Sequence, residues 1–410
     1  MAATALLFLL ITSLFIPSYT HDIQSPDQEA FISIVISQQG LDFLKNLLVT
    51  KTISSIIPLN LPRIEKTVKV PFLGYVRMRL SNITLHEIDV LSSYVKPGDT
   101  GVAIIASGTT CNLSSSWYYQ YSSWLLPVEI VDRGGASVQV EGMQVGLTLG
   151  LENQNGTLKL SLINCGCYVK DVSIKLDGGA SWLYQGMLDA FEEQIGAAVE
   201  NAITKKLREG ILKLDSFLQS LPKEVPVDDN ASLNVTFVKD PLLSNSSIGF
   251  DINGLFTARK KFLVPMNKYQ SSQPSVFCKD SSKMLGISLD EAVFNSASAL
   301  YYDDIHGSGS VKISGNKLGG SLKLNYFSMS LKWSNIGNLR LYLVQPVMWT
   351  LIQTVFLPYA NAKLGQGFPL PIVHGFTLKN AEIVCSRSKT TVCGDVEYSE
   401  LQDLNQIMFT

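Results

Sequence analysis

The stretch from residue 181 to residue 221 constrains the fold more than any other part of the chain. Its apolar residues recur at steps of three and four, at Met187, Phe191, Ile195, Val199, Ile203, Leu207, Ile211, Leu214, Leu218 and Leu221. These steps place them all on one face of an α-helix. The opposite face carries charges such as Glu192, Lys205 and Arg208, and no proline interrupts the run before Pro222. At about 1.5 Å per residue the helix is about 60 Å long, so it needs an equally long apolar surface to pack on.

The residues before this helix predict such a surface, because apolar and polar residues alternate there with a period of two. The alternating apolar residues are Val76, Met78, Leu80, Val138, Val140, Val145, Leu147, Leu149, Leu151, Leu158, Leu160, Leu162, Ile174 and Leu176. The pair Asn155-Gly156 is typical of a tight hairpin turn. We therefore expect an antiparallel meander with one apolar face. A β-rich segment at 31–37 and a helix over 41–56 that ends before Pro58 precede it.

After Pro222 the plan repeats in a shorter form. Pro222, Pro226 and Pro241 lie among Asp, Asn and Ser residues, which is typical of a connection between two halves. Residues 288–291 form a capping box that predicts a helix from Ser288 to about residue 302. We expect strands around 311–313, 322–324, 329–333 and 339–343, a second helix that begins at Pro346, and a return to strand at 367–384.

The first twenty residues resemble a secretory signal peptide, with a short apolar core followed by small residues. No later apolar run reaches the roughly 20 residues that span a bilayer. We therefore expect a secreted, extracellular protein. Its formal net charge of −2 gives no general attraction to nucleic acid, so no nucleic-acid partner is expected.

Six asparagines in the first 250 residues begin N-x-Ser/Thr sequons, and we expect glycosylation there. They are Asn82, Asn112, Asn155, Asn230, Asn234 and Asn245. The alternative is chance in a chain rich in Ser and Asn.

Six cysteines in an oxidising compartment allow up to three disulfides. Cys385 and Cys393 flank what looks like a hairpin loop, and we expect them to pair across it. Cys165 or Cys167 could reach Cys111, and Cys278 then has no obvious partner.

Motifs for chemistry are missing, so we expect neither an enzyme, nor a metal site, nor a cofactor. No CxxC pair occurs and the four histidines are scattered, which does not fit zinc. The segment 307–310 lacks the strand-to-helix context of a nucleophile elbow. The side chains of adjacent acidic residues point in different directions in a helix or a strand, so they do not form a catalytic pair. No glycine-rich phosphate loop precedes a helix.

The order of elements, together with the segments 36–43, 137–182 and 361–371, resembles the family of bactericidal/permeability-increasing protein and lipopolysaccharide-binding protein, with its plant branch closest. The resemblance covers nearly all of the chain after residue 20. It implies an α+β fold, a boomerang of two antiparallel-sheet barrels, each wrapped on a long helix and joined by a central sheet. The corresponding division is a signal peptide at 1–20, an N-terminal lipid-binding barrel at 21–221, a linker with central-sheet strands at 222–250, and a truncated C-terminal barrel with further central-sheet strands at 251–410.

Three departures from this family stand out. Roughly 80 residues are missing just after residue 302, since the second half is too short for a full barrel sheet, as in an alternatively spliced or deleted form. The C-terminal barrel is therefore expected to be incomplete. The family disulfide joins a cysteine before the long helix to one within it, but this helix has no cysteine. Finally, one strand of the tip, 117–124, is aromatic where the animal proteins are basic.

The resemblance implies recognition of bacterial lipopolysaccharide through its lipid A, an antimicrobial role in innate immunity, and acyl chains buried between the sheet and the long helix. The expected lipid-binding residues lie at the tip of the first barrel: Lys66, Lys69, Arg77, Arg79, Trp117, Tyr119 and Trp124. They would meet a phosphorylated headgroup or a microbial membrane surface. The alternatives are an ordinary solvated face for the basic residues and strand packing for the aromatic ones. Two other functions fit, a phospholipid transfer protein and a truncated decoy or interaction form with weak lipid binding; the receptor partner is unknown.

Overall fold

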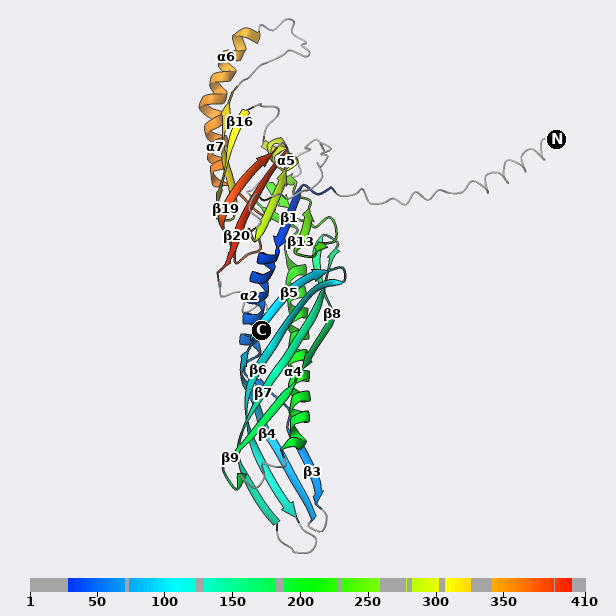
Figure 1. Ribbon diagram of the computed structural model, residues 1–410. Helices are drawn as coiled ribbons and strands as arrows, with labels where there is room; N and C mark the ends of the chain where they lie inside the picture. Colours follow the sequence, from blue (N-terminus) through cyan, green and yellow to red (C-terminus); the bar gives the residue numbers. More distant parts are fainter. Residues whose placement is uncertain are drawn as a thin grey trace, which may run out of the picture.

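The computed structural model describes residues 29–70, 74–122, 129–181, 188–227, 231–258, 278, 282–301, 307–325, 341–386 and 388–399. Figure 1 shows an elongated molecule, with a long sheet and helix α4 in one half, a smaller second half, and a central sheet between them. This is the expected α+β architecture.

The first half is built on an eight-stranded antiparallel sheet in the order β2-β4-β6-β7-β8, in which β3 pairs with β4, β5 with β6 and β9 with β7. Its strands are β2 (Leu59–Asn60), β3 (Ile64–Val70), β4 (Gly74–Asp89), β5 (Ser92–Gly98), β6 (Gly101–Ser122), β7 (Glu129–Gln154), β8 (Thr157–Tyr168) and β9 (Asp171–Asp177). The alternation expected from the sequence is present in β4, where Val76, Met78 and Leu80 are buried while Tyr75 and Arg77 are exposed.

The long helix α4 (Asp189–Ser220) lies along the apolar face of this sheet (Figure 1). Phe191, Ile195, Val199 and Ile203 are buried, at steps of four, in one core with the inward side chains of β4, β6, β7 and β9. Each of these side chains stabilises the fold by about 1.5–3 kcal/mol relative to an exposed position. The prediction of a long amphipathic helix on a sheet is confirmed.

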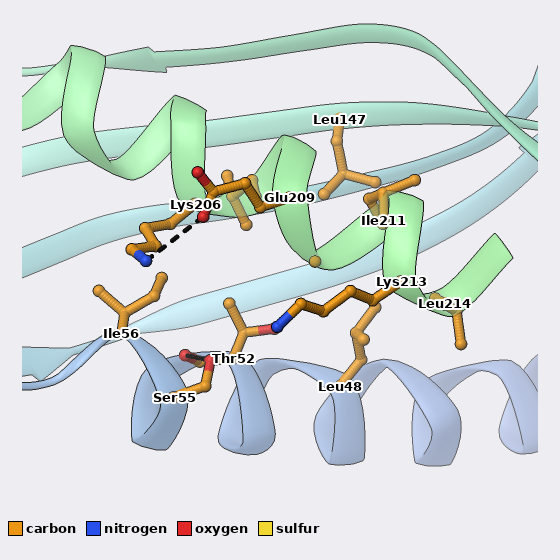
Figure 2. A pocket seen from close by; sticks show the side chains of 12 residues that line it. Leu48, Thr52, Ser55, Ile56, Leu147, Lys206, Glu209, Ile211, Lys213 and Leu214 are labelled. Atoms are coloured by element: carbon orange, nitrogen blue, oxygen red, sulfur yellow. Dashed lines mark hydrogen bonds and ion pairs between the residues drawn. The ribbon is translucent and has the colours of Figure 1, made fainter. Parts of the chain in front are cut away.

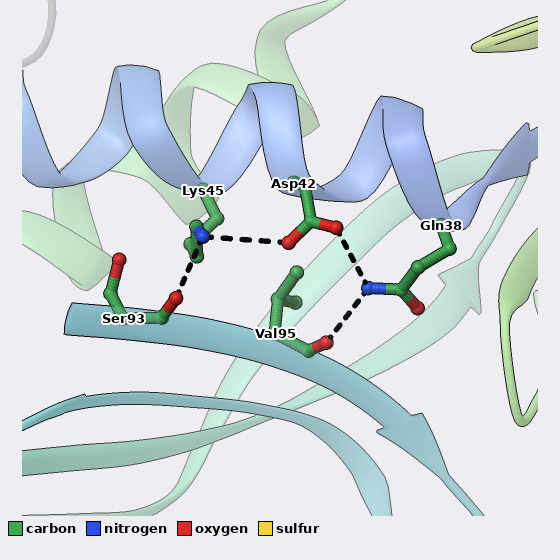
Figure 3. Close-up of polar contacts among 5 residues, drawn as sticks. All are labelled: Gln38, Asp42, Lys45, Ser93 and Val95. Carbon is green, nitrogen blue, oxygen red and sulfur yellow. Dashed lines mark hydrogen bonds and ion pairs between the residues drawn. The ribbon is translucent and has the colours of Figure 1, made fainter.

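Helix α2 (Gln38–Ile56) is held beside the sheet by polar contacts with edge strand β5, shown in Figure 3. Lys45, although buried, donates from Nζ to the carbonyl oxygen of Ser93 at 2.9 Å and lies 3.4 Å from Asp42. Gln38 Nε2 donates to the carbonyl oxygen of Val95 at 3.1 Å. These side chains occupy backbone acceptors that an edge strand otherwise leaves to solvent, so α2 has a defined place relative to the sheet and α4.

The central sheet combines strands from the start, the middle and the end of the chain, in the order β12-β13-β1-β15-β20-β19. They are β12 (Leu242–Ser244), β13 (Ser247–Ile252), β1 (Ile32–Ser37), β15 (Leu285–Asp290), β20 (Lys389–Tyr398) and β19 (Phe376–Ser386). Ile32, Leu289 and Val392 are fully buried in its core. A separate three-stranded sheet contains β10 (Glu224–Pro226), β11 (Ala231–Asn234) and β14 (Phe256–Ala258).

The second half is less complete than the first, as expected from its length. Among its described residues the sheet has three strands, β16 (Gly307–Ser314), β17 (Lys317–Leu324) and β18 (Phe368–Pro369). Its helices are α5 (Glu291–Tyr301) and a continuous run of α6 (Leu341–Leu351), the π-helical turn η2 (Ile352–Phe356) and α7 (Leu357–Gln366).

Helix boundaries in this half differ from the prediction. Ser288 lies in strand β15, opposite Ser33, and α5 begins at Glu291. Asp290 is the residue that caps it, because its Oδ1 accepts from the backbone N–H of Ala292 at 2.9 Å. The second helix already includes Leu341 and so does not begin at Pro346; residues 341–343, expected in a strand, are helical. A short apolar run does not distinguish these states. The strand expected at 329–333 lies outside the described residues.

The predicted disulfide between Cys385 and Cys393 is wrong. Cys393 is bonded to Cys278, and Cys385 is a free, exposed thiol. The hairpin between β19 and β20 is tighter than expected, so Cys385 lies opposite Thr390 while Cys393 lies opposite Glu382. Cys393 is therefore buried in the central sheet, out of reach of Cys385.

Candidate functional site

A groove lies between α2 and α4 above the inner face of the first-half sheet (Figure 2). It has a volume of about 80 Å³. Its apolar wall comes from both helices and from strand β7, and consists of Leu48, Ile56, Leu147, Leu207, Ile211 and Leu214. Over Phe191 to Ile203 the side chains of α4 pack against the sheet in one core, and the groove opens beyond it, beside Leu207 and Ile211 of α4. The groove is thus an apolar surface at the junction of the two helices.

Gly210 of α4 is one of the residues that line the groove. A Cβ atom built on Gly210 meets no other atom within 4 Å. Glycine in a helix interior lowers helix stability by about 1 kcal/mol relative to alanine. The groove is therefore lined at a position where α4 is locally less stable than an alanine would make it. An isolated glycine within the apolar period of the helix was the one signal in the sequence for this position.

Polar groups line the rim of the groove. Lys206 forms an ion pair with Glu209 on α4, with 3.3 Å between Nζ and Oε2. Lys213 reaches across the groove toward Thr52 in Figure 2 and has no ion pair within the described part of the chain. An apolar wall with a cationic rim is suited to an amphiphile with an apolar chain and an anionic or polar head.

The four basic residues expected at the tip do not share one face of the sheet. Arg77 and Arg79 point away from α4, because the alternate residues Val76, Met78 and Leu80 point toward it. Lys69 is exposed on β3, whereas Lys66 is half-buried and, by alternation, on the same side as buried Ile64. Arg77 Nε forms an ion pair with Glu65 Oε1 at 3.2 Å.

The expected aromatic residues lie mostly inside the first half. Trp117 and Tyr119 are 1% and 7% exposed and belong to the core against α4. Trp117 Nε1 donates to the carbonyl oxygen of Asp177 at 3.0 Å. Its indole fits only because Gly134 has no side chain, since a Cβ there would lie 2.6 Å from Nε1. Trp124 lies outside the described residues.

The sequon asparagines occupy different environments. Asn82, Asn155 and Asn245 are exposed. Asn112 donates to Glu87 at 2.6 Å, and Asn234 accepts from Thr236 of its own sequon. Asn230 lies outside the described residues, and glycosylation remains a prediction at all six.

Three thiols in the first half are free: Cys111, Cys165 and Cys167. Burial, with Asp89 nearby, raises the pKa of Cys111 to about 12. Burial, followed by the nearby Glu200 and the other two thiols, raises the pKa of Cys167 to about 12. Within the described ranges no three His, Cys, Asp or Glu side chains are grouped to hold a metal ion.

Among the described residues there is no helix with the length and apolar character needed to cross a membrane.

Comparison with known proteins gives consistent matches over both halves. Residues 40–221 match the N-terminal domain of the LBP / BPI / CETP family, and residues 304–398 match its C-terminal domain. A putative BPI/LBP family protein of Arabidopsis thaliana is 52% identical, over 96% of each chain. The bactericidal permeability-increasing protein of Sebastes schlegelii is 20% identical, over 90% of this chain and 95% of that protein.

The Arabidopsis alignment extends over 476 positions, whereas 96% of 410 residues is about 394. About 82 positions of that alignment thus have no counterpart in this chain, which agrees in size with the block expected to be missing.

The fold itself matches the crystal structure of a lipopolysaccharide binding protein with a TM-score of 0.70 and 15% identity, over 91% of this chain and all of that one. The two domain matches, the plant relative and the shared fold lead to one conclusion: the chain belongs to the LBP / BPI / CETP family.

Proposed function

We propose that this chain is a secreted lipid-binding protein that recognises bacterial lipopolysaccharide and serves innate immune defence. The observation that carries lipid binding is the groove between α2 and α4, with its apolar wall and cationic rim. Relatives named for binding lipopolysaccharide support the choice of lipid. The signal-like first twenty residues, the sequons and the Cys278–Cys393 disulfide support secretion.

In the proposed mechanism an acyl chain enters between the two helices and lies on Leu147 and Ile211. Each methylene group removed from water contributes about 0.8 kcal/mol. Because the groove volume of about 80 Å³ is below that of a cavity of about 150 Å³ that admits benzene, α2 and α4 must move apart around a chain. Lys213 then attracts an anionic or polar group at the rim, and the basic tip residues meet the microbial membrane surface.

Filling the groove tests this mechanism directly. We expect Gly210→Phe to lower saturable binding of a fluorescent acyl-chain probe by the full chain at least about tenfold, because the new ring occupies open space on the groove face. Removal of a helix-interior glycine does not weaken α4. The matched control is Gly365→Phe in α7, where a Cβ also meets nothing within 4 Å. Equal probe binding by the two variants would contradict a groove between α2 and α4 as the acyl-chain site.

The choice of lipid is tested with the wild-type chain and two probes, lipid A and phosphatidylcholine vesicles. Saturable binding of lipid A in preference to phosphatidylcholine supports the lipopolysaccharide proposal. Exchange of phospholipid between vesicles with no preference for lipid A contradicts it and favours a transfer protein. Mass spectrometry of lipids that copurify with the secreted protein provides an independent readout, and copurification of no lipid would favour a decoy or interaction form.

A further inference from the structure

A row of cross-strand neighbours lies on the outer face of the first-half sheet, on the side away from α4. Glu65 of β3 lies opposite Arg79 of β4, which lies opposite Tyr118 of β6, which lies opposite Arg133 of β7. Directly opposite residues on one face have Cβ atoms about 4.5–5.5 Å apart, so the two arginines flank the tyrosine. A shallow cleft of about 780 Å³ surrounds them, lined by Arg79, Ser81, Ser116, Trp117, Tyr118, Val131, Asp132, Arg133 and Gly134.

Arg79 is held in place without being neutralised. Its Cζ lies 4.6 Å from the centre of the Tyr118 ring, a cation–π contact that fixes the plane of the guanidinium group. Its Nε is buried and has no hydrogen-bond partner among the described residues. A buried N–H of a charged group without an acceptor is costly, and a bound anion would supply that acceptor.

The carboxylates around this row have other partners. Glu65 forms ion pairs with Arg77 at 3.2 Å and Arg63 at 3.5 Å. Asp132 accepts from the backbone N–H groups of Arg133 and Ala180 at 2.9 and 2.7 Å.

Two further carboxylates are also engaged: Glu129 accepts from Gln120, and Asp177 accepts from the backbone N–H of Gly178. Within the described part of the chain, no carboxylate forms an ion pair with the guanidinium of Arg79 or Arg133. The connecting segments 71–73 and 123–128 contain no acidic residue. The positive charge on either side of Tyr118 is therefore uncompensated by direct contacts.

We propose that Arg79 and Arg133 form an anion site on the outer face of the sheet that binds a phosphate group, with Tyr118 between them. Guanidinium groups bind phosphate oxygens through paired, charge-assisted hydrogen bonds. The phosphate belongs either to a lipid headgroup or to free phosphate.

This inference rests on the proposed lipid-binding function for the biological source of the phosphate, but it places the phosphate apart from the acyl-chain groove. The sheet separates the groove from the outer cleft, since Met78 and Leu80 face α4 while Arg79 faces outward. A lipid whose chain fills the groove thus does not also supply the phosphate at Arg79. The outer cleft would instead contact a separate phosphorylated lipid in the surface on which the protein acts.

The test compares vesicle binding by the full chain and by a variant with both Arg79→Gln and Arg133→Gln. The vesicles are phosphatidylcholine with or without phosphatidic acid, which carries a phosphate monoester. We expect the double variant to lose at least about tenfold in affinity for the phosphatidic acid vesicles. The matched control, Lys96→Gln with Lys205→Gln, removes the same charge from exposed positions outside the cleft and should lose much less.

The variant Arg79→Lys keeps the positive charge but loses the paired N–H donors of the guanidinium group. We expect it to lose most of the affinity for phosphatidic acid vesicles that Arg79→Gln loses. Circular dichroism and urea unfolding check that each variant is folded.

Inorganic phosphate alone distinguishes the two sources. If millimolar phosphate competes with the vesicles, and binds directly to the wild-type chain but not to the double variant, the site binds free phosphate. Loss of vesicle binding in the double variant without competition by phosphate assigns it to a lipid headgroup. Equal vesicle binding by the double variant and its lysine control, with no phosphate binding, would overturn the proposal. Uptake of an acyl-chain probe, which Gly210→Phe reduces, should not change in the arginine variants, so failure of the groove and failure of this site are distinguishable.

Discussion

At the scale of single residues, the side of the sheet on which a side chain lies decides its role. Trp117, Tyr118 and Tyr119 are equivalent in sequence, as three aromatic residues in one strand. In the structure Trp117 and Tyr119 pack in the core, while Tyr118 lies on the outer face beneath Arg79. Of the three, Tyr118 is thus the one on the outer face of the sheet.

The cysteines give a prediction at the same scale. The raised pKa of Cys111 and Cys167, about 12 for each, keeps both thiols protonated at pH 8, and the thiolate is the nucleophile. We expect a thiol reagent at pH 8 to modify exposed Cys385 quickly, and Cys111 and Cys167 only after unfolding in urea. Mass spectrometry of labelled peptides reads this out. Rapid labelling of Cys111 in the folded chain would show that its burial is wrong.

The raised pKa values of these thiols also predict how the free energy of unfolding changes with pH. A thiol with a raised pKa in the folded state stabilises it below the ordinary value of 9.0, and this contribution is lost as pH rises toward about 12. The free energy of unfolding should therefore fall above about pH 9, and less steeply in a Cys111→Ala variant.

At the scale of elements, the continuous helix from α6 to α7 carries an apolar stripe without a partner among the described residues. Val347, Leu351, Val355 and Tyr359 follow one another at steps of four, and each is more than half exposed. Ile352 and Ala360, on another side of the helix, are buried. A helix with a wide apolar surface normally lies on a sheet, and the second-half sheet has only three described strands. The stripe is therefore an apolar surface that the described strands leave uncovered.

Neighbouring substitutions in this helix should therefore differ in their effect on stability. We expect Ile352→Ala to lower the free energy of unfolding of the second half by about 2–4 kcal/mol, because it removes a buried side chain. Leu351→Ala should change it by less than about 0.5 kcal/mol, because Leu351 is 51% exposed. Urea unfolding followed by circular dichroism compares the two. An equal loss for both would mean that the stripe is covered in solution.

At the scale of the whole molecule, the two halves differ in how much core they bury. The first half has eight strands on a 32-residue helix, whereas β16 in the second half is exposed along most of its length. Local stability follows burial and hydrogen bonding. We expect backbone amides of β6, β7 and α4 to exchange with deuterium much more slowly than those of β16 and α6, as measured by mass spectrometry. Exchange at one common rate would show that the central sheet couples the halves into one cooperative unit.

The sequence alone determined the long helix, the alternating strands beneath it, the family and the shortage in the second half. These features follow from periodicity and length, which are local properties of the chain. The start of α5 at Glu291 and the helical state of residues 341–343 escaped local reasoning, because Ser288 pairs within strand β15 and a short apolar run fits helix and strand equally well.

Only the tertiary structure decided which distant residues meet. It paired Cys393 with Cys278 in place of Cys385, because register in the β19–β20 hairpin separates the expected partners. It formed the groove at the α2–α4 junction, and it brought Arg133 beside Tyr118 and Arg79. Contacts of this kind depend on strand register and helix placement across long sequence separations, which the pattern of apolar residues does not specify.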